Sequence, residues 1–249
     1  MNQGQGVAGA MRGGVPTILR GRGSVGEVPL RPAADTLDGS MSRSGPHLRS
    51  GRRGPVLVLV TGFGSFEKVS ENPSASITRA LAVRPPPGVE VVPAVLPVSF
   101  ARAPRAFDRS LARLRPRVPD LILGLGVMRE KGFRLELRAR GNSRGRARTD
   151  VDGRSASERV SSAGPTLRTP LESWLRRYAE AQGLRLSEYA GGYVCERLYH
   201  HLLVRSREID RAGVFLHVPP ARHTPVEEQI DVVRRFLVAL TRGAGSRAL

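Results

Sequence analysis

Hydrophobic runs alternate with amphipathic segments from residue 55 to the end of the chain. The run from Val56 to Val60 is apolar and β-branched, which is typical of a strand buried on both faces. After a glycine-containing turn, Asn72 and Pro73 suit the cap and the first position of a helix. Strands are then expected at 89–96, 120–124 and 213–218, and helices at 101–114, 171–182, 195–204 and 226–240. This alternation predicts an α/β fold, a three-layer α/β/α domain around a twisted, mainly parallel mixed sheet.

Single residues refine this pattern. Pro93 interrupts the expected strand 89–96 and cannot donate a ladder hydrogen bond, so this strand belongs at an edge or a bulge. Gly183 is expected to end the helix before it. Residues 129–156 break the alternation, because FRLELRA suggests one exposed strand and a long polar loop follows it.

Residues 1–54 differ in composition from the rest of the chain. They are rich in Gly, Arg, Ser and Pro and show neither helical nor strand periodicity. We expect a disordered extension in front of a single α/β domain over residues 55–249. An Arg-rich transit peptide is an alternative interpretation, and translation starting at Met41 is another.

Net charge points toward nucleic acid, but its distribution does not. The chain has 40 basic and 22 acidic residues, a formal net charge of +18, and clustered Lys and Arg would neutralise phosphates. Only Lys68 and Lys131 are lysines, and the arginines are scattered through every segment. Aromatic residues, at 5%, are too few for a base-stacking surface. Nucleic acid is therefore not expected as the main partner, and an Arg-rich nucleic-acid binder stays a minor alternative.

The cysteine count and the hydropathy limit the class of protein further. A single cysteine cannot form an intramolecular disulfide or supply the thiolates of a structural zinc site. No apolar run approaches the roughly 20 residues needed to cross a bilayer, and the first residues lack the core of a secretory signal. We expect a cytoplasmic, soluble protein with no metal and no membrane partner.

Two glycine-containing turns lack the sequence pattern of a nucleotide-binding loop. GFGSFE has Glu67 where the dinucleotide fingerprint needs Gly or Ala, and the run from Gly124 to Gly126 leads into Arg129. No nucleotide or other cofactor is expected. GFGSFE does place Phe63 and Phe66 at the carboxyl end of a buried strand, where α/β sheets bind ligands, although both rings could instead pack under a helix.

Cys195 is the candidate nucleophile. Gly191 and Gly192 break the chain before it, and an apolar helical stripe follows, so Cys195 lies in the first turn of a helix. The unpaired N–H groups and the positive end of the helix dipole would lower the thiol pKa there. A small buried core residue is the alternative, because free cysteine is often buried.

A cysteine nucleophile needs a base, and His217 is the best placed. It lies near the end of an expected buried strand, whereas His200 and His201 are five and six residues beyond the thiol on its own helix and are expected to be solvated. His223 follows two prolines in a loop. Glu136, between apolar neighbours, could orient the imidazole, or it could be a solvated edge residue paired with an arginine.

Four segments together resemble a known family. VLVTGFGSF with ENPSA, LELRA, AGGYVCE and FLHVP occur in the order of the signature segments of pyroglutamyl peptidase type I, an intracellular cysteine peptidase family. The resemblance covers about residues 55–240 and implies an exopeptidase that hydrolyses the bond after an N-terminal pyroglutamyl residue. It implies a three-layer α/β fold and homo-oligomers. It also assigns a catalytic triad and a pocket for the pyroglutamyl ring: Cys195, His217 and Glu136 as the triad, and Phe63, Phe66, Tyr193 and Val194 as the pocket.

The sequence departs from the family beside two of these positions. Glu196 follows the nucleophile where the family usually has Asn, and a second carboxylate there should raise the pKa of the Cys195 thiol. Asn142 falls one residue later than the Asn of the family motif. A catalytically impaired member that binds N-terminally blocked peptides is therefore the main alternative.

Overall fold

The computed structural model describes residues 54–66, 71–140, 149–155 and 164–245. The predicted extension over residues 1–54 lies outside the described residues, apart from its last position. Most of the long polar loop predicted within 129–156 also lies outside them.

The described domain is built on a mixed, mainly parallel sheet of six strands. The strand order is β2-β1-β3-β8-β4-β7, and β4 runs antiparallel to β8 while the other neighbouring pairs are parallel. A short antiparallel pair, β5-β6, forms a second sheet. The strands are β1 (Val56–Phe63), β2 (Val89–Leu96), β3 (Leu121–Val127), β4 (Arg134–Glu136), β5 (Arg138–Ala139), β6 (Leu167–Arg168), β7 (Arg185–Ser187) and β8 (Ala212–Val218).

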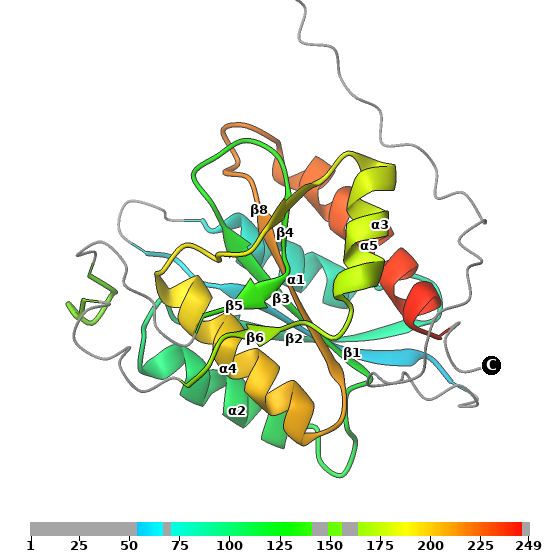
Figure 1. Cartoon of the computed structure of the whole chain (residues 1–249), viewed down its shortest axis with the longest axis horizontal. Coiled ribbons are helices and arrows are strands. Elements are labelled where there is room, and N and C mark those ends of the chain that lie inside the picture. The colour runs from blue at the N-terminus through cyan, green and yellow to red at the C-terminus, as the bar shows by residue number, and fades with distance from the viewer. Residues whose placement is uncertain (1–53, 67–70, 141–148, 156–163, 246–249) are drawn as a thin grey trace, which may run out of the picture. The chain divides into compact units, whose positions relative to one another are not determined.

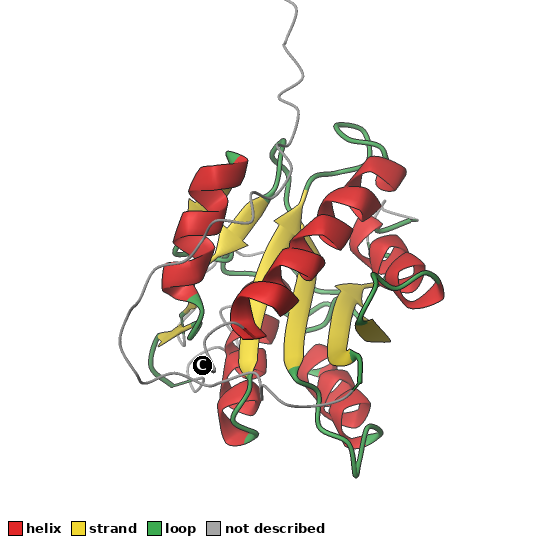
Figure 2. Ribbon diagram, turned by 90° about the vertical axis from the view of Figure 1, so that its right-hand side faces the viewer, coloured by secondary structure: helices red, strands yellow, loops and turns green. Residues whose placement is uncertain are grey.

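Helices cover both faces of this sheet, as Figures 1 and 2 show. One face carries α1, α3 and α5, whose apolar side chains share a core with strands β1, β3 and β8. The other face carries α2 and α4, which lie side by side in Figure 1 and share a second core with the opposite side of the same strands. The helices are α1 (Pro73–Val83), α2 (Arg102–Ala112), α3 (Glu172–Gln182), α4 (Val194–Glu208) and α5 (Val226–Gly245). The predicted three-layer α/β fold is confirmed.

Local signals in the sequence have the expected structural effects. Asn72 caps α1, because its Oδ1 accepts a hydrogen bond from the Ser74 N–H at 3.1 Å. Gly183 ends α3 with a φ of 63°, a left-handed conformation that favours glycine. Pro93 lies in β2, which is an edge strand.

The expectation of one exposed strand in FRLELRA is wrong. This segment forms β4 and β5, and the side chains of Leu135 and Glu136 are fully buried. The strand β7, which the sequence analysis missed, pairs with the outer edge of β4. On the α4 side, the Tyr199 hydroxyl donates a 2.8 Å hydrogen bond to the Glu136 carbonyl oxygen. The segment is therefore covered by parts of the chain that are distant in sequence.

Candidate active site

Glu136 and His217 form a buried acid–imidazole pair. His217, the next-to-last residue of β8, is 3% exposed, and Glu136 at the end of β4 is 0% exposed. The His217 Nδ1 lies 2.6 Å from Glu136 Oε1. Because an ionised carboxylate can only accept, Nδ1 carries the proton and Nε2 has the free lone pair. Within the described residues, Nε2 has no hydrogen-bond partner.

Arg134 is a third member of this cluster. Its Nε donates a 2.9 Å hydrogen bond to Glu136 Oε1, the same oxygen that His217 contacts. Burial opposes ionisation of Glu136, but the hydrogen bond and charge of His217 and the charge of Arg134 outweigh it, so the pKa of Glu136 lies below its ordinary value. Glu136 is therefore ionised at neutral pH although it is buried.

Cys195 approaches the sheet over Gly126. A Cβ atom added at Gly126 would lie 2.9 Å from the Cys195 Sγ, so the sulfur fills the space of a missing side chain on β3. Gly126 and His217 are register partners on neighbouring strands, and such partners point to the same face of a sheet. The thiol from α4 and the imidazole from β8 are therefore neighbours on one face.

The Gly-Leu-Gly segment thus has a packing role. Gly124 and Gly126 lie within β3 and face α4. A Cβ at Gly124 would lie 2.4 Å from the Phe215 ring. Both positions lack a side chain where the ring of Phe215 and the thiol of Cys195 come close to the strand.

The electrostatic surroundings of the thiol differ from the expectation. Burial raises the pKa of the Cys195 thiol, the carboxylates of Glu136 and Glu196 raise it further, and the value reaches about 12. The backbone N–H of Cys195 and the charge of Arg134 oppose this change. The predicted lowering by the helix N-terminus is wrong, because burial and two carboxylates outweigh the dipole. The predicted effect of Glu196 is confirmed in its direction.

Glu196 itself is an internal carboxyl group. It is 0% exposed, and its Oε1 accepts a hydrogen bond from the Arg140 N–H. Burial raises its pKa, while the backbone N–H groups of Arg140, Ala190 and Gly192 partly offset that effect. Its second oxygen is buried and has no hydrogen-bond partner among the described residues. Glu196 therefore joins the chain after β5 to the start of α4.

The turn before α4 requires its glycines. Gly191 and Gly192 have φ values of 96° and 64°, which other residues rarely adopt. Tyr193 follows as the N-cap, its hydroxyl donates a 2.8 Å hydrogen bond to the Thr149 carbonyl oxygen, and its ring packs edge-on against Phe100 at 5.4 Å. The start of α4 is thereby held against a segment about 40 residues earlier in the chain.

The other predicted pocket residues belong to the same apolar core. Phe63 ends β1 and is buried, Val194 is fully buried, and Phe66 and Tyr193 are partly buried beside them. All four pack in the core under α2 and α4, together with Cys195. Phe63 and Val194 expose little surface, so Phe66 and Tyr193 are the two of these residues that are partly exposed.

The remaining histidines make contacts elsewhere. His200 Nε2 lies 2.9 Å from the Pro165 carbonyl oxygen, and His201 Nε2 lies 2.9 Å from Asp108 Oδ1. The expectation that His200 is solvated is wrong, because it is buried. His223 is exposed in the loop after β8.

Two residues of the cluster escaped the sequence analysis, Arg134 and Gly126. Arg134 lies two positions before Glu136, and this spacing on a strand places both side chains on one face. This spacing is visible in the sequence, but arginine is also common on an exposed strand, so the spacing alone does not single out Arg134. For Gly126 the signal was a glycine in an apolar strand, which indicates close approach of another group.

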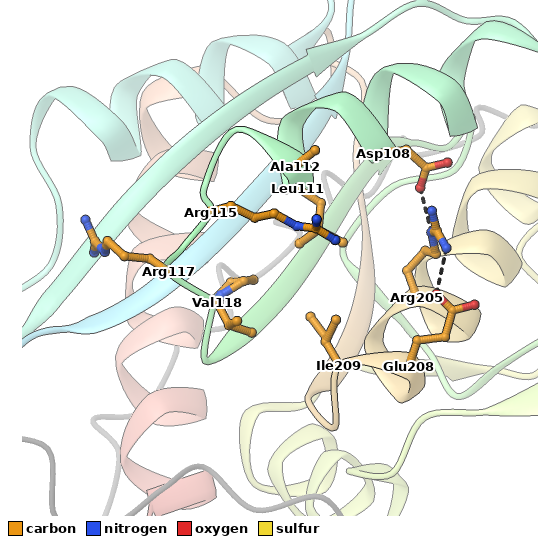
Figure 3. A pocket seen from close by; sticks show the side chains of 10 residues that line it. Asp108, Leu111, Ala112, Arg115, Arg117, Val118, Arg205, Glu208 and Ile209 are labelled. Carbon is orange, nitrogen blue, oxygen red and sulfur yellow. Dashed lines mark hydrogen bonds and ion pairs between the residues drawn. The ribbon is translucent and has the colours of Figure 1, made fainter.

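A separate cavity of about 150 Å³ lies at the opposite end of α4 (Figure 3). Arg205, ten residues after Cys195, lies in its wall and pairs with both Asp108 and Glu208. The cavity is therefore about 15 Å along the helix from the thiol. It contains none of the predicted site residues.

The described residues contain no group of three or more His, Cys, Asp or Glu side chains arranged to hold a metal ion. No helix among them is long and apolar enough to span a membrane.

Known proteins share both the sequence and this fold. Residues 56–232, most of the chain, match the pyroglutamyl peptidase family. Pyrrolidone-carboxylate peptidase 1 of Ralstonia nicotianae is 28% identical over 172 residues, 65% of this chain and 77% of that protein. The pyrrolidone-carboxylate peptidase of Streptomyces coelicolor is 29% identical over 199 residues, 77% of this chain and 89% of that protein.

A solved structure gives the same fold. The pyrrolidone carboxyl peptidase of Fervidobacterium islandicum AW-1 aligns with a TM-score of 0.64 at 23% identity, over 75% of this chain and 99% of that one. The family match spans both strands that carry Glu136 and His217 and the helix that carries Cys195. The chain therefore belongs to the pyroglutamyl peptidase family.

Proposed function

We propose that this protein is a cysteine exopeptidase that removes N-terminal pyroglutamate from peptides, with Cys195 as nucleophile, His217 as base and Glu136 as the group that orients His217. The observation that carries the proposal is the Glu136–His217 pair beside the thiol over Gly126. Family membership supports the same activity. A cytoplasmic location and homo-oligomers are part of the proposal, the first being supported by the single cysteine.

The raised thiol pKa determines the order of the steps. A thiol with a pKa of about 12 is protonated at neutral pH, so His217 Nε2 takes its proton as the sulfur attacks the pyroglutamyl carbonyl. The N–H groups in the first turn of a helix have no carbonyl partner within the helix, and those of α4 would bind the developing oxyanion. His217 then protonates the departing amine, and water activated by His217 hydrolyses the thioester and releases pyroglutamate.

An apolar pocket would explain why the enzyme prefers substrates whose N-terminus is blocked. Phe63, Phe66, Tyr193 and Val194 belong to the same apolar core as Cys195, and an apolar lining suits a neutral lactam. A free α-amino group would lose its hydration there without gaining a partner. The impaired-binder and nucleic-acid alternatives gain no support from the comparisons, because the matched family and relatives are named as peptidases.

Substrate selectivity tests the proposal. We expect hydrolysis of a pyroglutamyl arylamide, and a kcat/KM at least about 100-fold lower for glutaminyl and prolyl arylamides. Iodoacetamide should abolish turnover by modifying Cys195, the only thiol in the chain. Folded protein that does not hydrolyse the pyroglutamyl amide, or that hydrolyses all three equally, would overturn the proposal.

Replacement of Gly126 by alanine tests whether this glycine sets the position of the Cys195 thiol. The new Cβ would lie 2.9 Å from the Cys195 Sγ and 3.1 Å from the Phe215 ring, so the thiol must move. We expect kcat to fall by about 100-fold, because a misplacement near 1 Å costs that much. Steady-state kinetics on protein with a normal circular dichroism spectrum measure this effect.

Gly213→Ala is the matched control. Its Cβ would lie 2.4 Å from Leu202, also on α4, but nearly two turns from Cys195. Both variants should lose about 1–3 kcal/mol of unfolding free energy through overpacking. Equal losses of kcat in the two variants would show that Gly126 has no special relation to the thiol.

A further inference from the structure

Arg134 makes its strongest contact inward, toward the acid–imidazole pair. It is the register partner of His217 on the antiparallel pair β4-β8. Its Nε and the His217 Nδ1 share one carboxylate oxygen of Glu136, at 2.9 and 2.6 Å. The Arg134 side chain is 18% exposed, so it is well shielded from water. One buried carboxylate therefore faces two cationic or potentially cationic groups.

The outward contact of Arg134 is weaker. Its Nη1 lies 3.6 Å from Oε2 of Glu130, which is exposed. Arg185, the register partner of Arg134 on β7, lies 3.1 Å from the same Glu130 oxygen but has no contact with Glu136. Arg134 and Arg185 are register partners and both approach the Glu130 carboxylate. Of these two arginines, only Arg134 contacts the Glu136–His217 pair.

We propose that Arg134 is a positioning residue of the Cys195 centre, holding the Glu136 carboxylate in the orientation and charge state that His217 requires. Arg134 acts through Glu136 and does not contact the substrate. This inference rests on the proposed function, since it assigns a role within that reaction.

The charges around the centre support this role. The carboxylates of Glu136 from β4 and Glu196 from α4 both raise the pKa of the thiol, His217 from β8 is hydrogen-bonded to Glu136, and Ser187 is the register partner of Glu136 on β7. Burial opposes ionisation of both Glu136 and Cys195. The charge of Arg134 lowers the pKa of Glu136 and also that of the Cys195 thiol. Among these groups Arg134 is the permanent cation, so it offsets the charge of the buried carboxylate.

Removal of the Arg134 charge should raise the pKa of both Glu136 and Cys195. Glu136 would bind a proton at a higher pH, so the acid limb of the kcat/KM profile should move to higher pH. Deprotonation of Cys195 would become harder, so its alkylation at a fixed pH should become slower. KM should stay nearly constant, because the pocket is unchanged.

The experiment compares Arg134→Gln, Arg134→Lys and the control Arg185→Gln by pH-dependent kinetics with a pyroglutamyl arylamide. Arg134→Gln is expected to move the acid limb up by about one pH unit. It should also lower kcat about tenfold at pH 6 to 7, because the Glu136 carboxylate loses its fixed orientation. Arg134→Lys keeps the charge but not the planar donor, so its profile should lie between those of Arg134→Gln and the wild type. Arg185→Gln should match the wild type.

Combining the Arg134 and Glu136 substitutions distinguishes a role of Arg134 through Glu136 from a general loss of stability. In a Glu136→Gln background, Arg134→Gln should change kcat less than about twofold, because the residue that it positions is already neutral. A full additional loss in that background would overturn the proposal, and so would equal effects of the Arg134 and Arg185 variants. If Arg134→Gln does not fold, an Arg134→Lys profile identical to that of the wild type, in both acid limb and kcat, would also overturn it.

Alkylation gives a readout that needs no peptidase activity. The chain has one cysteine, so the rate of iodoacetamide incorporation against pH reports Cys195 alone. Arg134→Gln should shift this profile to higher pH relative to the wild type and Arg185→Gln. Absence of pyroglutamyl hydrolysis in the wild type would reject the proposed function, while an unchanged alkylation profile would reject the role of Arg134.

Discussion

Replacement of Cys195 by alanine is expected to reduce hydrolysis of a pyroglutamyl arylamide by at least about 10⁵-fold in kcat, to near the uncatalysed rate. The sulfur forms the covalent bond in the proposed reaction, and the other side chain close to Gly126, the ring of Phe215, is not a nucleophile. Oriented N–H groups in the α4 turn would remain, but without a nucleophile they give only a small residual rate.

The measurement uses enzyme concentrations high enough to detect this small residual rate. Circular dichroism and thermal unfolding verify the fold, since Cys195 also packs in the core under α2 and α4. Val204→Ala, on the same helix, is a suitable control for a small loss of packing, and it should keep wild-type kcat. Substantial turnover by folded Cys195→Ala would contradict the assignment of the nucleophile.

Replacement of His217 by glutamine is expected to lower kcat by about 10³- to 10⁴-fold, the range for removal of a general base. The thiol pKa of about 12 makes this loss severe, because little thiolate forms without a base. The residual rate should increase with pH until the fold is lost, since solvent hydroxide then deprotonates Cys195. The wild type should not show this dependence above neutral pH.

His201→Gln is the matched control for the second prediction. His201 lies on α4 and contacts Asp108, away from the thiol, so this variant should keep wild-type kcat and pH dependence. A residual rate of His217→Gln that is independent of pH would contradict the role of His217 as the base. Equal losses in the two variants would contradict it as well.

The fold was largely predictable because its signals are local. The β-branched run in β1, the cap at Asn72 and the left-handed glycine at Gly183 all act within a few residues. The strand β7 was missed because it has only three residues and exposes much of its surface. Its existence depends on pairing with β4, about 50 residues earlier in the chain.

The candidate site was predictable in part. The start of an expected helix indicates Cys195, the end of an expected strand indicates His217, and apolar neighbours on a strand indicate Glu136. The resemblance to a family adds their catalytic roles, which remain predictions. The sequence analysis did not find Arg134, because its importance comes from sharing the Glu136 oxygen with His217, which is 81 residues beyond Glu136.

The sequence alone determined which side chains are available and which local elements present them: a thiol at the start of α4, a histidine at the end of β8 and glycines in β3. Only long-range packing set the environment of those groups. It buried Glu136, brought the Glu136 carboxylate to the thiol in addition to that of the adjacent Glu196, and raised a pKa that the helix dipole was expected to lower. Burial and charge depend on neighbours from other strands and helices, and no local pattern records those neighbours.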